Sequence, residues 1–197
     1  MLSALRTPAR AIQQGRVVDT DRPWEATTGY VLHGEPFEVY PNRDSTPFVG
    51  QYDLPAGWRP RTFVRGTLRL AGWRDAWADV FTVVRDGTPE QLDALAADLA
   101  QRHPMRPGDH DRVVLAVELG VTTAERAWHG RYLLDVTGDD RETAMARAVS
   151  VPLAHAGTQI LAGAAPAGLH RALPDPAGAA DFLTFLRGRG LDCVLSS

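Results

Sequence analysis

The feature that most constrains the fold is a change in the spacing of apolar residues between positions 61 and 84. Residues 61–70 alternate as a β-strand does. Directly afterwards, apolar residues recur at steps of three and four, which is typical of a helix packed along one side. These residues are Trp73, Ala76, Trp77, Val80, Phe81 and Val84. A strand followed at once by an amphipathic helix predicts a mixed fold, of the α+β or mixed-sheet α/β class.

Further elements are predicted on both sides of this segment. Strands are expected at residues 16–19, 37–40, 112–119 and 127–136, with a polar loop between the first two, a turn at 120–123 and a short strand after Gly190. Helices are expected after Thr88 with Gln91 completing a capping box, over residues 141–163 with a kink or restart at Pro152, and after Asp175. A length of 197 residues favours one domain over residues 1–197.

Composition excludes several classes of protein. With 44% hydrophobic and 23% charged residues the chain is an ordinary globular protein, and a net charge of -3 gives no general footprint for nucleic acid. No run of 18 apolar residues and no signal-peptide core is present, so we expect no membrane contact and a cytoplasmic location. All 21 basic residues are arginine, which excludes a lysine Schiff base and a P-loop lysine.

The first candidate site lies on the predicted strand at residues 61–70. Arg65, Thr67 and Arg69 project from one face of that strand, and the Cα atoms of the two arginines are expected roughly 13 Å apart. That span suits a ligand whose carboxylates lie at separated positions, because guanidinium groups bind carboxylates in a bidentate manner. The alternative is a solvated sheet face, on which exposed arginines are common.

The second candidate site follows the strand at residues 37–40. Arg43 is a candidate for a bidentate carboxylate contact, Asn42 and Ser45 for further hydrogen bonds, and Asp44 for orienting an arginine or accepting from an ammonium group. The alternative is a simple turn, since Asn and Asp side chains bond their own backbone in turns.

Neither a catalytic residue nor a metal site emerges from the remaining sequence. The histidines lack the spacing of zinc ligands, and the single cysteine, Cys193, has no partner within the chain. No evident nucleophile and base pair is present, so the catalytic residues stay unknown and no metal is expected.

Two short motifs give more specific information than the spacing of apolar and polar residues. Tyr40-Pro-Asn-Arg-Asp-Ser-Thr46, followed about twenty residues later by Val64-Arg-Gly-Thr-Leu-Arg69 and Gly72-Trp73, resembles the saccharopine dehydrogenase family, especially its glutamate-forming saccharopine reductases. The resemblance is strongest over residues 37–77 and weaker after residue 110. It implies the substrate-binding and dimerisation domain at the carboxyl end of that family.

The resemblance also implies a chemistry. Family members reduce an imine between glutamate and aminoadipate semialdehyde with NADP(H), and the motif matching Asn42, Arg43, Asp44 and Ser45 contacts saccharopine. Saccharopine is a tricarboxylate, so the resemblance implies an amino-acid-type carboxylate as the ligand of the clustered arginines, including Arg65 and Arg69.

One departure from the family limits these implications. The GxGxxG fingerprint of a Rossmann domain is missing, so we expect this chain to bind no cofactor alone, with NADP(H) implied only beside a Rossmann domain or separate Rossmann subunit. The expected function is therefore the substrate-binding portion of such an oxidoreductase, assembled as a homodimer. Whether the chain itself is an enzyme stays open, and the alternative is a non-catalytic, stand-alone amino-acid-binding or dimerisation module. The apolar helix around Trp73 would be core or a dimer face.

Overall fold

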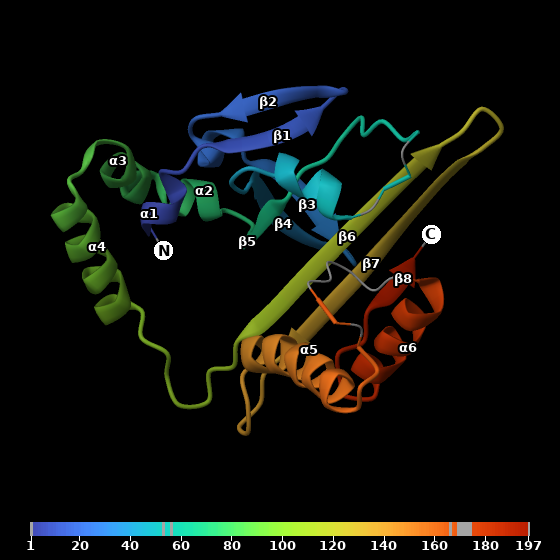
Figure 1. The fold of residues 1–197 in the computed structure, drawn as a ribbon. Coiled ribbons are helices and arrows are strands. Elements are labelled where there is room, and N and C mark those ends of the chain that lie inside the picture. Colours follow the sequence, from blue (N-terminus) through green and yellow to red (C-terminus); the bar gives the residue numbers. More distant parts are fainter. Residues whose placement is uncertain (1, 53, 56, 166, 169–174, 197) are drawn as a thin grey trace. The chain divides into compact units, whose positions relative to one another are not determined.

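The computed structural model describes residues 2–52, 54–55, 57–165, 167–168 and 175–196. By its internal contacts the chain divides into two compact units, Met1–Pro104 and Met105–Ser197. Each unit combines helices with antiparallel strands (Figure 1), which confirms the predicted mixed class. This division is based on packing contacts alone. The single domain expected over residues 1–197 therefore stays a prediction.

The first unit contains two small antiparallel sheets and several short helices. One sheet pairs β1 with β2, and the other has the order β3-β4-β5. The elements are α1 (Leu2–Leu5), β1 (Ala9–Gln13), β2 (Arg16–Thr20), the 3-10 helix η1 (Pro23–Ala26), β3 (Thr28–Leu32), β4 (Glu35–Pro41), the 3-10 helix η2 (Thr46–Gln51), β5 (Gly66–Leu70), α2 (Trp73–Ala76), α3 (Ala78–Asp86) and α4 (Pro89–Arg102).

The predicted polar loop between residues 19 and 37 is wrong, because it contains η1 and the strand β3. This strand shows no clean alternation of burial, which is why its pattern was not visible in the sequence. Its pairing with β4 is set by the turn His33–Gly34, in which both residues have a positive φ, as a type I′ hairpin turn requires.

The strand predicted at residues 61–70 is shorter in the structure and begins at Gly66. A Cβ atom at Gly66 would lie 2.6 Å from the side chain of Val39, so glycine permits the close approach of β5 to β4. Upstream of Gly66 the chain changes partner: Phe63 and Ile12 exchange two backbone hydrogen bonds of 2.9 Å. Residues 61–65 are therefore not part of β5: Phe63 bonds β1, and Arg65 bonds Asn42 in the loop after β4.

The core of the first unit is rich in aromatic residues. Trp73 and Phe81 are buried and pack edge to face at 5.1 Å, and Tyr40 stacks on Trp73 at 5.0 Å. The apolar stripe predicted over residues 73–84 thus packs in the core, although its helix is divided into α2 and α3 at Trp77. The predicted capping box is confirmed, since Thr88 and Gln91 bond each other's backbone amides at the start of α4.

The second unit is a three-stranded antiparallel sheet of order β6-β7-β8 with two helices. Its elements are β6 (Arg112–Thr122), β7 (Ala127–Thr137), α5 (Ala144–Leu161), α6 (Pro176–Arg187) and β8 (Val194–Ser196). Both long strands extend beyond their predicted ends, and the predicted turn at 120–123 is displaced, because Thr123 and Arg126 close the hairpin. The restart expected at Pro152 does not occur, since proline removes only one intrahelical bond from a helix of 18 residues.

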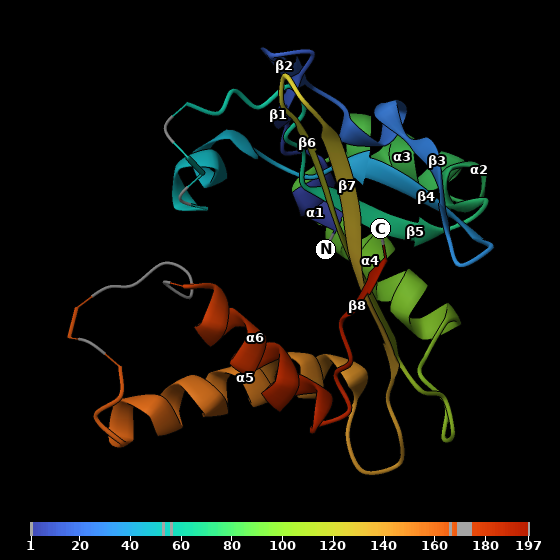
Figure 2. The same cartoon turned by 90° about the vertical axis from the view of Figure 1, so that its right-hand side faces the viewer.

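The helices α5 and α6 lie alongside each other (Figure 2), with His155 of α5 in ring contact with Phe182 and Phe185 of α6. Their inner faces cover buried Leu134 and Val136 of β7. Within the described residues, no helix is both long and apolar enough to span a membrane.

Candidate substrate-binding site

The candidate site is formed by the loop between β4 and η2 and by the segment that leads into β5. The strand β4 ends at Pro41, and the backbone amide of Asn42 then donates a 2.7 Å hydrogen bond to the carbonyl oxygen of Arg65. The structure therefore brings the two candidate sites together, although twenty-three residues separate Asn42 from Arg65 in the sequence.

Ser45 is fully buried, with 0% of its surface exposed. Its amide donates to the carbonyl oxygen of Arg10 at 2.7 Å, and its hydroxyl oxygen accepts from the amide of Arg65 at 3.0 Å. The residue thereby joins β1, the loop and the approach to β5. Its predicted hydrogen bond to a ligand stays a prediction, while its position supports an indirect role in which it holds the loop against Arg65.

Arg43 has a left-handed backbone, with φ of 53°. Such a conformation costs about 1–2 kcal/mol for a residue other than glycine. Two other described residues of this kind, Gln14 and His33, lie in hairpin turns, whereas Arg43 is held by a 3.0 Å hydrogen bond from the amide of Arg10 to its carbonyl oxygen. Its side chain is exposed. Backbone strain that surrounding contacts enforce is common at ligand-binding sites.

Asp44 stabilises the loop through its side chain. One carboxylate oxygen accepts from the hydroxyl of Thr46 at 2.7 Å and from its amide at 2.8 Å, and the other lies 3.9 Å from the Arg10 guanidinium. These hydrogen bonds from Thr46, assisted by Arg10, hold the pKa of Asp44 below its ordinary value. The predicted role of orienting an arginine thus has a partner in Arg10.

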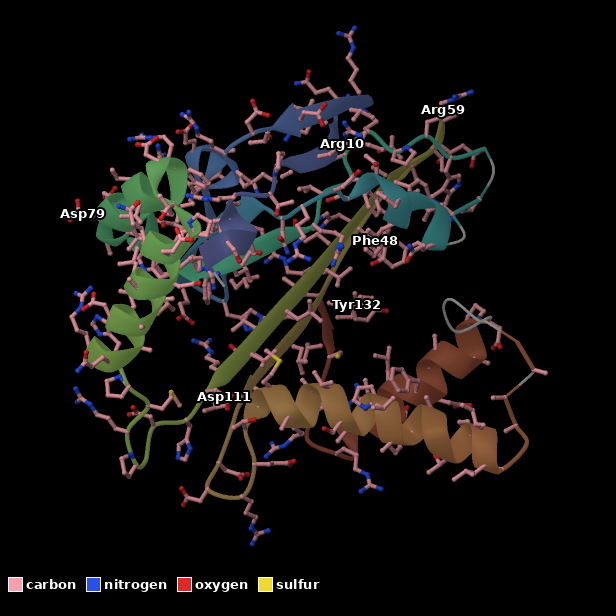
Figure 3. All side chains as sticks on the ribbon, turned by 60° about the vertical axis from the view of Figure 1, so that its left-hand side comes forward. Arg10, Phe48, Arg59, Asp79, Asp111 and Tyr132 are labelled. Carbon is pink, nitrogen blue, oxygen red and sulfur yellow. The ribbon has the colours of Figure 1, made fainter. Side chains whose placement is uncertain are left out.

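Arg65 lies just before β5, and its guanidinium group stacks over the ring of Phe48 in η2, 3.8 Å from the ring centroid. A cation held on an aromatic face keeps its edge free for hydrogen bonds. Figure 3 labels Phe48 on η2 and Arg10 on β1, the two elements that contact the loop.

Thr67 and Arg69 lie further along β5 and share a sheet face with Tyr40, which pairs with Thr67 in the register. The guanidinium of Arg69 donates to the Tyr40 hydroxyl at 3.3 Å and lies 5.5 Å from the Trp73 ring centroid. Within the described part of the chain, Nε of Arg69 is buried without a hydrogen-bond partner. Arg65 and Arg69 therefore have different surroundings, and do not form the uniform row expected of one strand face.

The three arginines of the site, Arg43, Arg65 and Arg69, have no carboxylate partner among the described residues. By contrast, Arg10 pairs with Asp19 at 2.6 Å. Unpaired guanidinium groups attract carboxylates and present them with a matched pair of donors. The arrangement can therefore bind a ligand with more than one carboxylate.

Sequence reasoning missed Arg10 and Phe48 as members of this site. Arg10 contributes backbone bonds to Arg43 and Ser45, and Phe48 supports Arg65. No local pattern identifies either residue, because their contacts lie more than fifteen positions away in the sequence. The buried alanines Ala9 and Ala11 on either side of Arg10 are a weak sign of a strand with Arg10 on its outer face.

The described residues do not form a nucleotide site of the Rossmann kind. A Rossmann site needs parallel strands joined through a glycine-rich turn and a helix, whereas all pairs of named strands in the described ranges are antiparallel. No group of three or more histidine, cysteine or acidic residues suited to a metal ion occurs among those residues either.

Fold and candidate site together define a mixed α/β protein with an arginine-rich loop after β4. A family model described as "Saccharopine dehydrogenase C-terminal domain" matches residues 1–191. The chain therefore belongs to the saccharopine dehydrogenase C-terminal domain family, as the two sequence motifs predicted.

Individual relatives agree with this assignment. The NADP+-dependent, L-glutamate-forming saccharopine dehydrogenases of Schizosaccharomyces pombe and Pyricularia oryzae are each 37% identical over 76 residues, which cover 37% of this chain and 16% of theirs. The apo L-Glu-forming saccharopine dehydrogenase of Saccharomyces cerevisiae has a similar fold, with a TM-score of 0.80 at 20% identity over 99% of this chain and 60% of that chain. This chain thus spans only part of the length of these relatives.

Proposed function

We propose that this chain is the substrate-binding portion of a saccharopine dehydrogenase-like oxidoreductase, and that Arg43, Arg65 and Arg69 bind its carboxylate substrate. The observation that carries the proposal is Arg43, whose strained backbone is fixed by Arg10 while its guanidinium group stays exposed and without a carboxylate partner among the described residues. Family membership and the names of the relatives support saccharopine or glutamate as the ligand.

The hydride transfer of such an oxidoreductase requires a nucleotide-binding domain from elsewhere. In this proposal NADP(H) binds to that domain, and this chain orients the substrate for the interconversion of saccharopine with glutamate and aminoadipate semialdehyde. Its antiparallel sheets supply no nucleotide site of the Rossmann kind in the described residues. The purified chain alone is therefore expected to bind substrate without reducing NADP+.

The direct test is calorimetric titration of the 197-residue chain with saccharopine and with glutamate, in the presence and absence of NADPH. Arg43→Ala is expected to weaken saccharopine binding at least ~10-fold, because a hydrogen bond to a charged group contributes about 1.5–3 kcal/mol. Arg16→Ala, which removes an exposed arginine from β2, should leave the affinity unchanged. Equal affinities of the Arg43→Ala variant and the unmodified chain would exclude this site.

A second candidate function is a non-catalytic amino-acid-binding or dimerisation module. The observation that favours it is the exposed apolar surface of α5. A chain that binds saccharopine but fails to support saccharopine oxidation, when a purified nucleotide-binding half of a relative is added with NADP+, would favour this second function over the first.

A further inference from the structure

The ring of Phe48 in η2 lies beneath the guanidinium group of Arg65, with Cζ of Arg65 3.8 Å from the ring centroid. At this distance the two groups are in van der Waals contact. Arg65 is exposed, whereas Phe48 is half-buried. One side of the guanidinium group is therefore covered by the ring, while its N–H donors, which lie in its own plane, stay open to a ligand.

Both residues are anchored to the buried Ser45. The amide of Phe48 donates a 3.1 Å hydrogen bond to the carbonyl oxygen of Ser45, and the amide of Arg65 donates one of 3.0 Å to its hydroxyl oxygen. Asp44 also fixes the start of η2, because its carboxylate accepts from the amide and the hydroxyl of Thr46. The backbones of Phe48 and Arg65 are thus held in one frame, and the place of the guanidinium group depends on the side chain of Arg65.

We propose that Phe48 is a positioning residue, whose ring holds the Arg65 guanidinium group ready to bind a carboxylate of the substrate. This inference rests on the proposed function. A long arginine side chain loses much of its rotational freedom when it binds a ligand. A contact that already restricts the side chain in the free protein reduces this loss and so raises the affinity. Phe48 acts in this way without touching the ligand.

The three arginines of the site are held in different ways, so the role of Phe48 is specific to Arg65. Arg43 is fixed through its backbone. The guanidinium group of Arg69 donates to the Tyr40 hydroxyl at 3.3 Å. For Arg65 the contact that holds the guanidinium group is the ring of Phe48. Loss of this ring should therefore release one arginine of the three, and weaken substrate binding without abolishing it.

A double-mutant cycle tests whether Phe48 acts through Arg65. Calorimetric titration with saccharopine compares the 197-residue chain with Phe48→Leu, Arg65→Ala and the double variant. Phe48→Leu is expected to weaken binding roughly 2- to 5-fold, the factor that a cation–π contact at an exposed site contributes. Arg65→Ala should weaken it at least ~10-fold. Phe48→Leu should have no further effect in the Arg65→Ala background, because the group that it positions is gone.

Two further variants separate this role from a general contribution to the fold. Phe48→Tyr keeps an aromatic ring under the guanidinium group and should bind saccharopine like the unmodified chain. Tyr52→Leu is the matched control, since it removes a ring close to η2 that packs against Phe63, with ring centroids 5.9 Å apart. This control variant should keep the affinity of the unmodified chain.

Nuclear magnetic resonance gives a readout that does not depend on saccharopine. The Nε–H signal of Arg65, assigned by its absence in Arg65→Ala, should be shifted upfield by the ring current of Phe48. This shift should vanish in Phe48→Leu and persist in Phe48→Tyr. Titration with citrate, a simple tricarboxylate, should move the same signal, and Phe48→Leu should need more citrate for the same change.

Several outcomes would overturn the inference. These are equal affinities of Phe48→Leu and the unmodified chain for both ligands, an equal loss from Phe48→Leu in the Arg65→Ala background, and an Arg65 signal that Phe48→Leu leaves in place. If citrate gives the expected differences but saccharopine does not bind, the proposed function is wrong and the role of Phe48 stands. A chain that binds neither ligand would overturn both.

Discussion

The hydroxyl oxygen of Ser45 accepts a hydrogen bond from the backbone amide of Arg65, at 3.0 Å and twenty residues away in the sequence. Through this bond the loop that carries Arg43 is fixed against the segment that carries Arg65. Because Ser45 also bonds the carbonyl oxygen of Arg10, a single buried side chain and its own backbone hold three segments in place.

We predict that Ser45→Ala lowers the free energy of unfolding by about 1–3 kcal/mol, since it leaves the Arg65 amide without its acceptor. Saccharopine affinity should fall at the same time, because the loop is no longer fixed. Urea unfolding measures the first effect and calorimetry the second. Ser3→Ala, at an exposed position, should change stability by less than about 0.5 kcal/mol. Equal stability losses in the two variants would refute the role given to Ser45.

We predict that Arg43→Gly abolishes ligand binding without lowering the stability of the fold. Glycine adopts the left-handed conformation without strain, so the free energy of unfolding should stay constant or rise by up to about 1 kcal/mol. Ligand binding should nevertheless be lost with the guanidinium group. Arg59→Gly is the matched control: its exposed residue is not strained, and glycine there should only destabilise. Thermal unfolding of both variants checks the prediction, and a marked loss of stability in Arg43→Gly would contradict it.

Glu38 connects the β3-β4-β5 sheet to helix α2. Its two carboxylate oxygens accept from the amides of Gly72 at 3.0 Å and Arg74 at 2.8 Å. Glu38→Ala is expected to lower the free energy of unfolding by about 1–2 kcal/mol, as loss of a helix cap does. Glu38→Gln keeps one acceptor oxygen and should lose about half as much. Urea unfolding that ranks the two variants in the reverse order would count against this connection.

Stability should depend on pH through Asp111, which caps helix α5. The amide of Met145, at 2.8 Å, and that of Ala144, at 2.6 Å, hold the pKa of Asp111 below its ordinary value. A carboxyl whose pKa is lowered by folding stabilises the protein above its unfolded value, about 3.9, and this stabilisation is lost as the pH falls through the folded value. Asp111→Asn should therefore reduce stability at neutral pH and flatten its decline in acid.

Urea unfolding at neutral pH and at several acidic pH values measures this effect. Asp181→Asn removes an exposed carboxylate of α6 that has no hydrogen bond or ion pair within the described chain, and should leave the decline unchanged. An Asp111→Asn variant with the same acid decline as the unmodified chain would disprove the contribution of Asp111.

Much of the candidate site could be predicted from the sequence, but the bounds of one strand and the burial of Ser45 could not. The loop at residues 42–45 follows a strand that the sequence reveals, and its motif carries the family resemblance. The strand at residues 61–70 was predicted too long, because alternation continues through residues 61–65 although β5 pairs with β4 only from Gly66 onward and Phe63 bonds Ile12 of β1. Burial of Ser45 could not be anticipated, since serine in a polar loop is ordinarily exposed.

The sequence by itself determined the mixed class of the fold, the capping box of Thr88 and Gln91, and the motifs of the family. These features depend on residues that are three or four positions apart, or on the identity of short segments, and both are visible in one chain. Only the tertiary structure decided that Arg10 and Phe48 belong to the site and that α5 exposes an apolar stripe. Both depend on which distant segments pack together, because burial and hydrogen bonding across many residues are properties of the folded chain as a whole.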